Sequence, residues 1–158
     1  MIFTCKTTNL NKAIQTVISS KPSTPIFSGI HLIADNNILE IQAMDLNMAI
    51  ACSIEAEIQE KGEIVVSAKH FSELMRKLPG ENVTIVKNKE EKTINVQSDK
   101  SDFQLLLMNE DDYPKFPEFN ADKQIVLEDE KIKELIKKTI FACSTDEARP
   151  LFTGILVA

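Results

Sequence analysis

The chain has 158 residues, 43% of them hydrophobic and 27% charged, and its formal net charge is -6. This length allows one complete core and part of another, and the negative charge taken alone argues mildly against a nucleic-acid partner. Polar residues interrupt the first ten positions where a signal peptide needs an apolar run, and no later run could span a bilayer, so we expect a cytoplasmic protein.

The first part of the chain predicts a strand, a helix and three more strands. Residues 2–5 read as a strand, and residues 10–18 place apolar side chains at helical spacing. A loop with Pro22 and Pro25 ends this helix, because proline cannot continue the helical hydrogen-bond ladder. The three strand-like runs that follow are residues 26–34, 38–44 and 48–58.

The same βαβββ order then recurs. Residues 63–66 predict a short strand, and Ser67 is a candidate N-cap for a helix with one apolar stripe, formed by Phe71, Leu74, Met75 and Leu78. A Pro-Gly pair at 79–80 ends the helix. Three more strands are expected at residues 83–86, 93–96 and 103–107.

A third copy of the pattern begins after an acidic, proline-bearing connector at residues 109–122. We expect a first domain at 1–120 and an incomplete second domain at 121–158, made of a strand at 125–127, a helix that Asp129 can cap, and a further strand. That last strand, PLFTGI at 150–155, repeats PIFSGI at 25–30. Because one helix and two strands cannot close a core, the natural chain is expected to be longer.

No recognised catalytic or cofactor-binding motif is present, so we expect a non-enzymatic protein without cofactor or metal. His31 should have a structural role on the opposite strand face from its neighbours. For His70, at the start of the second predicted helix, a surface or interface role and mere solvation are equal alternatives. The acidic runs 45–47 and 110–112 are read as solvated turns, since neither has the spacing of a calcium loop. The isolated Cys5, Cys52 and Cys143 are expected to be reduced core residues.

Each predicted helix carries a basic excess, whereas most acids fall in strands and connectors. The net charges are about +1, +2 and +1 in chain order. Two interpretations remain open: ordinary solvated helix faces, or one positive surface that meets phosphate on an otherwise negative protein. With no Trp and one Tyr, base stacking is disfavoured, so any DNA contact should be to the backbone and independent of sequence.

Five segments together resemble one family, the bacterial sliding clamp or beta subunit of DNA polymerase III. They are 24–30 (TPIFSGI), 45–48 (DLNM), 67–71 (SAKHF), 113–117 (YPKFP) and 144–154 (STDEARPLFTG). The resemblance implies an α+β DNA-clamp fold of two βαβββ units per domain, with helices on one face and antiparallel sheets outside. It also implies a head-to-tail homodimeric ring that encircles double-stranded DNA and tethers the replicative DNA polymerase, with a clamp loader as partner.

The resemblance assigns roles to particular residues. Lys21, Lys69 and Arg149 match DNA-facing positions. Four residues match the dimer edge of the first domain: His70, Lys100, Phe103 and Leu105. For Phe103 and Leu105, plain core alternation is an equal alternative. Arg149 and Phe152 border the family's pocket for short linear motifs, most of which would lie beyond Ala158.

The leading hypothesis is therefore a processivity factor represented by its first domain and the start of its second. A chain without the third domain is expected to be unable to close a ring. The alternative is a non-catalytic protein-interaction module of the same fold, and an enzyme is a distant third. A reading frame that continues through two more domain copies would favour the clamp.

Overall fold

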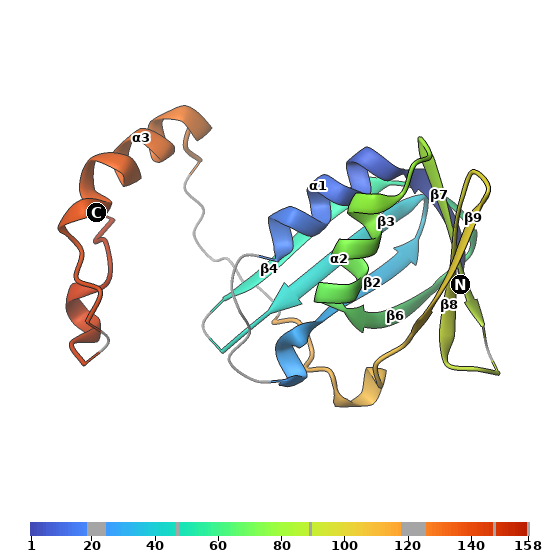
Figure 1. Cartoon of the computed structure of the whole chain (residues 1–158). Coiled ribbons are helices and arrows are strands. Elements are labelled where there is room, and N and C mark those ends of the chain that lie inside the picture. The colour runs from blue at the N-terminus through green and yellow to red at the C-terminus, as the bar shows by residue number, and fades with distance from the viewer. Residues whose placement is uncertain (19–24, 47, 89, 118–125, 147, 158) are drawn as a thin grey trace. The chain divides into compact units, whose positions relative to one another are not determined.

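A computed structural model describes residues 1–18, 25–46, 48–88, 90–117, 126–146 and 148–157 (Figure 1). The chain divides into two compact units, Met1–Glu118 and Phe119–Ala158. The division falls inside the acidic connector that the sequence predicts, two residues before the expected boundary. Among the described residues, no helix is long and apolar enough to cross a membrane.

Two antiparallel sheets form the first unit. The five-stranded sheet has the order β5-β1-β7-β8-β9, with β5 (Glu57–Glu60), β1 (Ile2–Lys6), β7 (Asn82–Asn88), β8 (Thr93–Ser98) and β9 (Ser101–Leu106). The four-stranded sheet has the order β4-β3-β2-β6, with β4 (Ala49–Glu55), β3 (Ile38–Met44), β2 (Gly29–Asp35) and β6 (Gly62–Ser67). An isolated bridge between Val66 and Leu107 links the end of β6 to the chain that leaves β9.

Two helices, α1 (Thr7–Val17) and α2 (Ala68–Lys77), run side by side over one face of the sheets (Figure 1). Each helix buries a stripe of apolar side chains at helical spacing, as with Leu10 and Ile14 on α1 and Phe71 and Met75 on α2, all at most 1% exposed. They pack against fully buried strand residues such as Phe3 and Ile85. The predicted layers, helices on one face and antiparallel sheets behind them, are confirmed.

The structure departs from the predicted strands at two places in the first unit. Residues Pro25–Ser28 form a 3-10 turn, so β2 begins only at Gly29; Pro25 fixes its own φ and suits the start of a helical turn better than a ladder. The predicted strand at 48–58 is two strands, because the chain leaves the four-stranded sheet at Ala56, pairs as β5 with β1, and so connects the two sheets.

The helix caps also differ from prediction. Ser67 occupies the N-cap of α2, but its side chain makes no capping hydrogen bond. In the second unit the helix α3 (Asp129–Thr139) has Glu128 at its N-cap, and Asp129 is its first helical residue. Asp129 and Glu130 still favour the helix start, because carboxylates interact well with the positive end of the helix dipole.

The strands predicted at 125–127 and 150–155 are wrong for the described residues. Val126 and Leu127 lie outside regular structure, residue 125 lies outside the described residues, and Pro150–Phe152 is a 3-10 turn. A strand needs a neighbour to satisfy its backbone groups, and the described part of this unit offers none. Its apolar side chains are accordingly exposed, with Val126 at 93% and Leu151 at 88%.

The cysteines are free; Cys5 belongs to the core and Cys52 packs against it, whereas Cys143 in the second unit is not part of this core. Cys5 in β1 is 5% exposed, and burial raises the pKa of its thiol from the usual 9.0 to about 12. Cys52 and Cys143 are partly exposed.

This burial predicts a pH dependence of stability. The folded state keeps the Cys5 proton to higher pH than the unfolded chain, so stability is lost as pH rises above the unfolded pKa. Between pH 9 and 10, in reducing buffer, the free energy of unfolding of the wild type should fall by about 1 kcal/mol more than that of Cys5→Ala, measured by urea denaturation. Equal slopes for the two proteins would show that Cys5 titrates normally.

Candidate nucleic-acid interface

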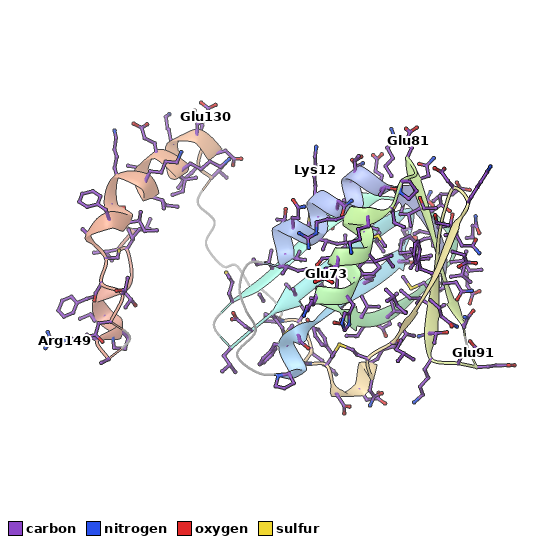
Figure 2. The ribbon with its side chains drawn as sticks, viewed as in Figure 1. Lys12, Glu73, Glu81, Glu91, Glu130 and Arg149 are labelled. Atoms are coloured by element: carbon purple, nitrogen blue, oxygen red, sulfur yellow. The ribbon has the colours of Figure 1, made fainter. Side chains whose placement is uncertain are left out.

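The exposed face of α1 and α2 carries four cations and one acid. Lys12 lies off the apolar stripe of α1 and is exposed, as Figure 2 shows. On α2 the exposed charges are Lys69, Arg76 and Lys77, with Glu73 the single carboxylate on the two helices. Both helices therefore present positive charge on the side that faces away from the sheets.

The acids of the first unit lie elsewhere. Apart from Glu73, every acidic residue in its described part falls outside α1 and α2, in strands, turns or the connector. Figure 2 labels Glu91 away from the helix pair, whereas Glu81 lies at the start of α1, where its carbonyl oxygen accepts from the Thr7 N–H at 2.8 Å. The protein's negative charge is thus distributed on the sheets and their connections. A surface divided in this way can attract a polyanion to one face while the net charge remains negative.

A hydrogen bond between the helices fixes their spacing. The side-chain amide of Asn11 on α1 donates from Nδ2 to the carbonyl oxygen of Met75 on α2, at 3.0 Å. Because Met75 is fully buried below this contact, the bond ties the exposed surfaces of both helices to the same core. The cationic side chains therefore project from two helices that are hydrogen-bonded to each other.

The three residues that resemblance assigns to DNA fall in different parts of the chain. Lys69 is exposed in the first turn of α2, on the cationic face. Lys21 lies outside the described residues. Arg149 is exposed in the second unit, where its backbone N–H donates to the Asp146 oxygen at 3.1 Å.

Two of the four residues assigned to a dimer edge, Phe103 and Leu105, lie on β9, an outer strand of the five-stranded sheet. Phe103 pairs with Val96 and Leu105 with Ile94, so both point to the inner face where Val96 and Ile94 are buried. Leu105 packs against the core, whereas Phe103 remains 41% exposed. Within this strand, Leu105 therefore fits the alternative of plain core alternation, whereas Phe103 is exposed at the edge of the sheet.

His70 at the start of α2 lies near one end of this edge. Together with Leu105 and Leu106 it lines a groove of about 250 Å³ between α2 and β9, completed by Val66, Ser67 and Gln104. Lys100 is exposed in the turn that precedes β9, at the opposite end of the strand. The structure thus groups His70 with Leu105 but not with Lys100.

In the second unit, the segment from Arg149 to Phe152 forms a compact turn. The Phe152 N–H donates to the Arg149 oxygen at 3.0 Å, and the Ser144 N–H donates to the Phe152 oxygen at 2.8 Å. The Phe152 ring is 60% exposed. The turn leaves both side chains exposed to solvent.

His31 has the structural setting that its strand position predicts. Its side chain lies opposite the fully buried Ile30 and Leu32, and Nε2 is 3.0 Å from Glu63 Oε2. The ring also lies 5.9 Å from the ring of Tyr113, centroid to centroid. His31 therefore helps to hold the connector against the outer face of the four-stranded sheet.

Sequence reasoning missed how firmly this connector is anchored. The Tyr113 hydroxyl donates to the Gly29 oxygen at 3.2 Å, and Lys87 Nζ lies 2.6 Å from Glu110 Oε1. Burial raises the pKa of the Tyr113 hydroxyl, partly opposed by a backbone hydrogen bond from Met44. In the sequence, the one indication that this connector is anchored was its tyrosine, an aromatic residue in a mostly polar, proline-containing segment.

The described residues contain no group of three or more histidine, cysteine, aspartate or glutamate side chains able to hold a metal ion. The acidic run at Glu110–Asp112 forms a 3-10 turn, with Glu110 paired to Lys87. Asn109 donates to Asp112 at 3.0 Å. These contacts show that the acidic residues 110–112 are part of a folded turn in the connector.

Comparisons with known proteins agree on one family. The family model for "DNA polymerase III beta subunit, N-terminal domain" matches residues 1–117. A Beta sliding clamp of Bacillus subtilis is 32% identical over 98% of this chain and 44% of its own length. One from Chlamydia muridarum is 29% identical over 95% of this chain and 41% of its own length. This chain thus spans less than half of these relatives.

Solved structures show the same likeness in three dimensions. A DNA polymerase sliding clamp from Bacillus subtilis superposes with a TM-score of 0.88 at 30% identity, over 96% of this chain and 42% of that one. The beta subunit from the DNA polymerase of Streptococcus pyogenes superposes with a TM-score of 0.90 at 25% identity, over 98% and 43%.

Proposed function

The chain belongs to the DNA polymerase III beta subunit family, and we propose that it is the first domain and the start of the second domain of a sliding clamp. The complete protein would encircle duplex DNA and tether the replicative polymerase in bacterial DNA replication. Its role is mechanical and not catalytic, and it works in the cytoplasm. The observation that carries the proposal is the placement of the cations on the exposed face of α1 and α2.

The charge distribution suits a protein that must hold DNA and also slide on it. Four cations on two helices attract phosphate, and the carboxylate of Glu73 on the same face moderates that attraction. An attraction to backbone phosphates carries no sequence information, so it is the same for every sequence. Long residence on DNA would then come from topology, because a closed ring leaves only at an end.

Ring closure requires surfaces that the chain supplies only in part. We propose that the edge formed by Phe103 and Leu105, with His70 beside it, pairs with the third domain of a partner chain in a head-to-tail homodimer. Residues from 121 onward would belong to the second domain, where Arg149 and Phe152 border a pocket for peptides of polymerases and repair proteins. The exposed apolar residues of the second unit fit a domain whose remaining strands lie further along the chain.

Topological binding can be tested with the full-length protein, loaded by its clamp loader with ATP onto nicked circular DNA. During gel filtration in high salt, the loaded protein should stay with circular DNA for minutes, and cutting that DNA once should release it. Equal loss from circular and cut DNA would overturn the proposal and favour a protein-interaction module of the same fold. Turnover of nucleotide by the clamp protein alone would instead indicate an enzyme.

A further inference from the structure

A groove of about 260 Å³ lies between α1 and α2 on the cationic face, next to the Asn11–Met75 hydrogen bond. It is lined by Asn11, Ile14, Gln15 and Ile18 from α1, and Ser72 and Arg76 from α2. Asn11 and Gln15 are four residues apart, as are Ser72 and Arg76, so each pair forms a row along its helix. The two rows face each other across the groove.

The lining is rich in hydrogen-bond donors and contains no acid. Arg76 is exposed and offers the five N–H donors of a guanidinium. Gln15 offers two amide donors from the opposite helix, and Asn11 has a second N–H beyond the one bound to Met75. A donor set with one positive charge, converging from two sides, matches a single oxyanion group.

The floor of the groove strengthens this match. Ile14 is 1% exposed and Ile18 is half-buried, so the side of the groove near the core is apolar. Hydrogen bonds to an anion are stronger beside an apolar wall than in open water. Because the Asn11–Met75 bond already sets the distance between the helices, a ligand would find the groove formed before it arrives.

We propose that this groove is a seat for one backbone phosphate of duplex DNA, held by Arg76 from α2 and Gln15 from α1. The inference rests on the proposed function, and it deepens it by distinguishing one position from the other cations of the face. Lys12, Lys69 and Lys77 would then act as diffuse charge, whereas Arg76 makes a directed contact. A phosphate bound at this position would fix the distance between the helix pair and the duplex without any contact between the protein and a base.

The test is equilibrium binding of the full-length protein to a short fluorescent duplex, followed by anisotropy over a salt series. Arg76→Gln should weaken binding about 5- to 10-fold and reduce the slope of log K against log salt by about 1. The matched control is Lys77→Gln, which removes the same charge from the neighbouring exposed position, outside the groove lining. It should weaken binding by less than about 2-fold.

A charge-neutral variant separates the groove from general electrostatics. Gln15→Ala should weaken binding about 2- to 4-fold with an unchanged salt slope, while Thr16→Ala, next to it on α1 and outside the groove lining, should leave the affinity unchanged. Unchanged circular dichroism and Tm for all variants would establish that each one is folded.

Two outcomes would overturn the proposed phosphate site. One is that Arg76→Gln and Lys77→Gln weaken DNA binding equally, and the other is that Gln15→Ala leaves DNA binding unchanged. Either result, obtained with a wild-type protein that stays on circular DNA, would refute the groove and leave the clamp function standing. A wild-type protein that leaves circular and cut DNA equally would refute the clamp function itself.

Discussion

Replacing Phe71 with alanine is expected to lower the free energy of unfolding of the first unit by about 3–5 kcal/mol. Phe71 is fully buried on α2 and belongs to the core cluster that joins both helices to the sheets. Removing the ring loses its transfer free energy and leaves a cavity that rigid neighbours fill only in part. Urea denaturation of the 158-residue chain, followed by circular dichroism, measures the loss.

The chain offers a matched control in Phe103→Ala. The same atoms are removed, but the Phe103 side chain is 41% exposed at the edge of the sheet, so the expected loss is about 1 kcal/mol. Because both variants change phenylalanine to alanine, the difference between their losses of unfolding free energy measures the effect of burial. Similar losses would mean that α2 is not packed as the structure shows.

Replacing Phe103 with lysine should separate the proposed full-length dimer into monomers. If the β9 edge pairs with a partner domain, the new charge is buried without a counter-ion on the inner face, at a cost of about 3 kcal/mol. That cost corresponds to a dissociation constant raised by about 100-fold. Analytical ultracentrifugation across a concentration series measures this change.

The control for this variant lies in the other sheet. Ile38 in β3 is 48% exposed, close to the 41% of Phe103, and lies outside both β9 and the groove beside His70. Ile38→Lys changes charge and residue type in a similar way but should leave the dimer intact. Dimers that survive Phe103→Lys, or that dissociate equally with Ile38→Lys, would place the self-association surface elsewhere.

The repeated βαβββ pattern was predictable because each element carries its own periodicity. Apolar residues at helical spacing gave α1 and α2, and β3 has the predicted bounds of residues 38–44. The 3-10 turn at Pro25 and the crossing at Ala56 were missed, because they depend on which strand lies alongside and not on local pattern. The strand predictions for the second unit failed because a strand also depends on its neighbours, and the apolar runs of this unit have no partner strand among the described residues.

The candidate interface was predictable only in outline. Counting charges on helices gave the cationic face, and family resemblance singled out Lys69 on it. Arg76 and Gln15 were not singled out, because they are 61 positions apart in the sequence and become neighbours only when α1 and α2 pack. The anchoring of Tyr113 to Gly29, 84 positions away, is equally invisible to local patterns.

The position of β1 inside the five-stranded sheet has a consequence for biosynthesis. The strand made first by the ribosome lies between β5 and β7, and Thr4 bonds through its hydroxyl to Thr84, 80 positions later. Contacts this distant in sequence slow folding, because a long loop must close before they form. The nascent first domain therefore waits for β7 to leave the ribosome exit tunnel before its sheet can assemble.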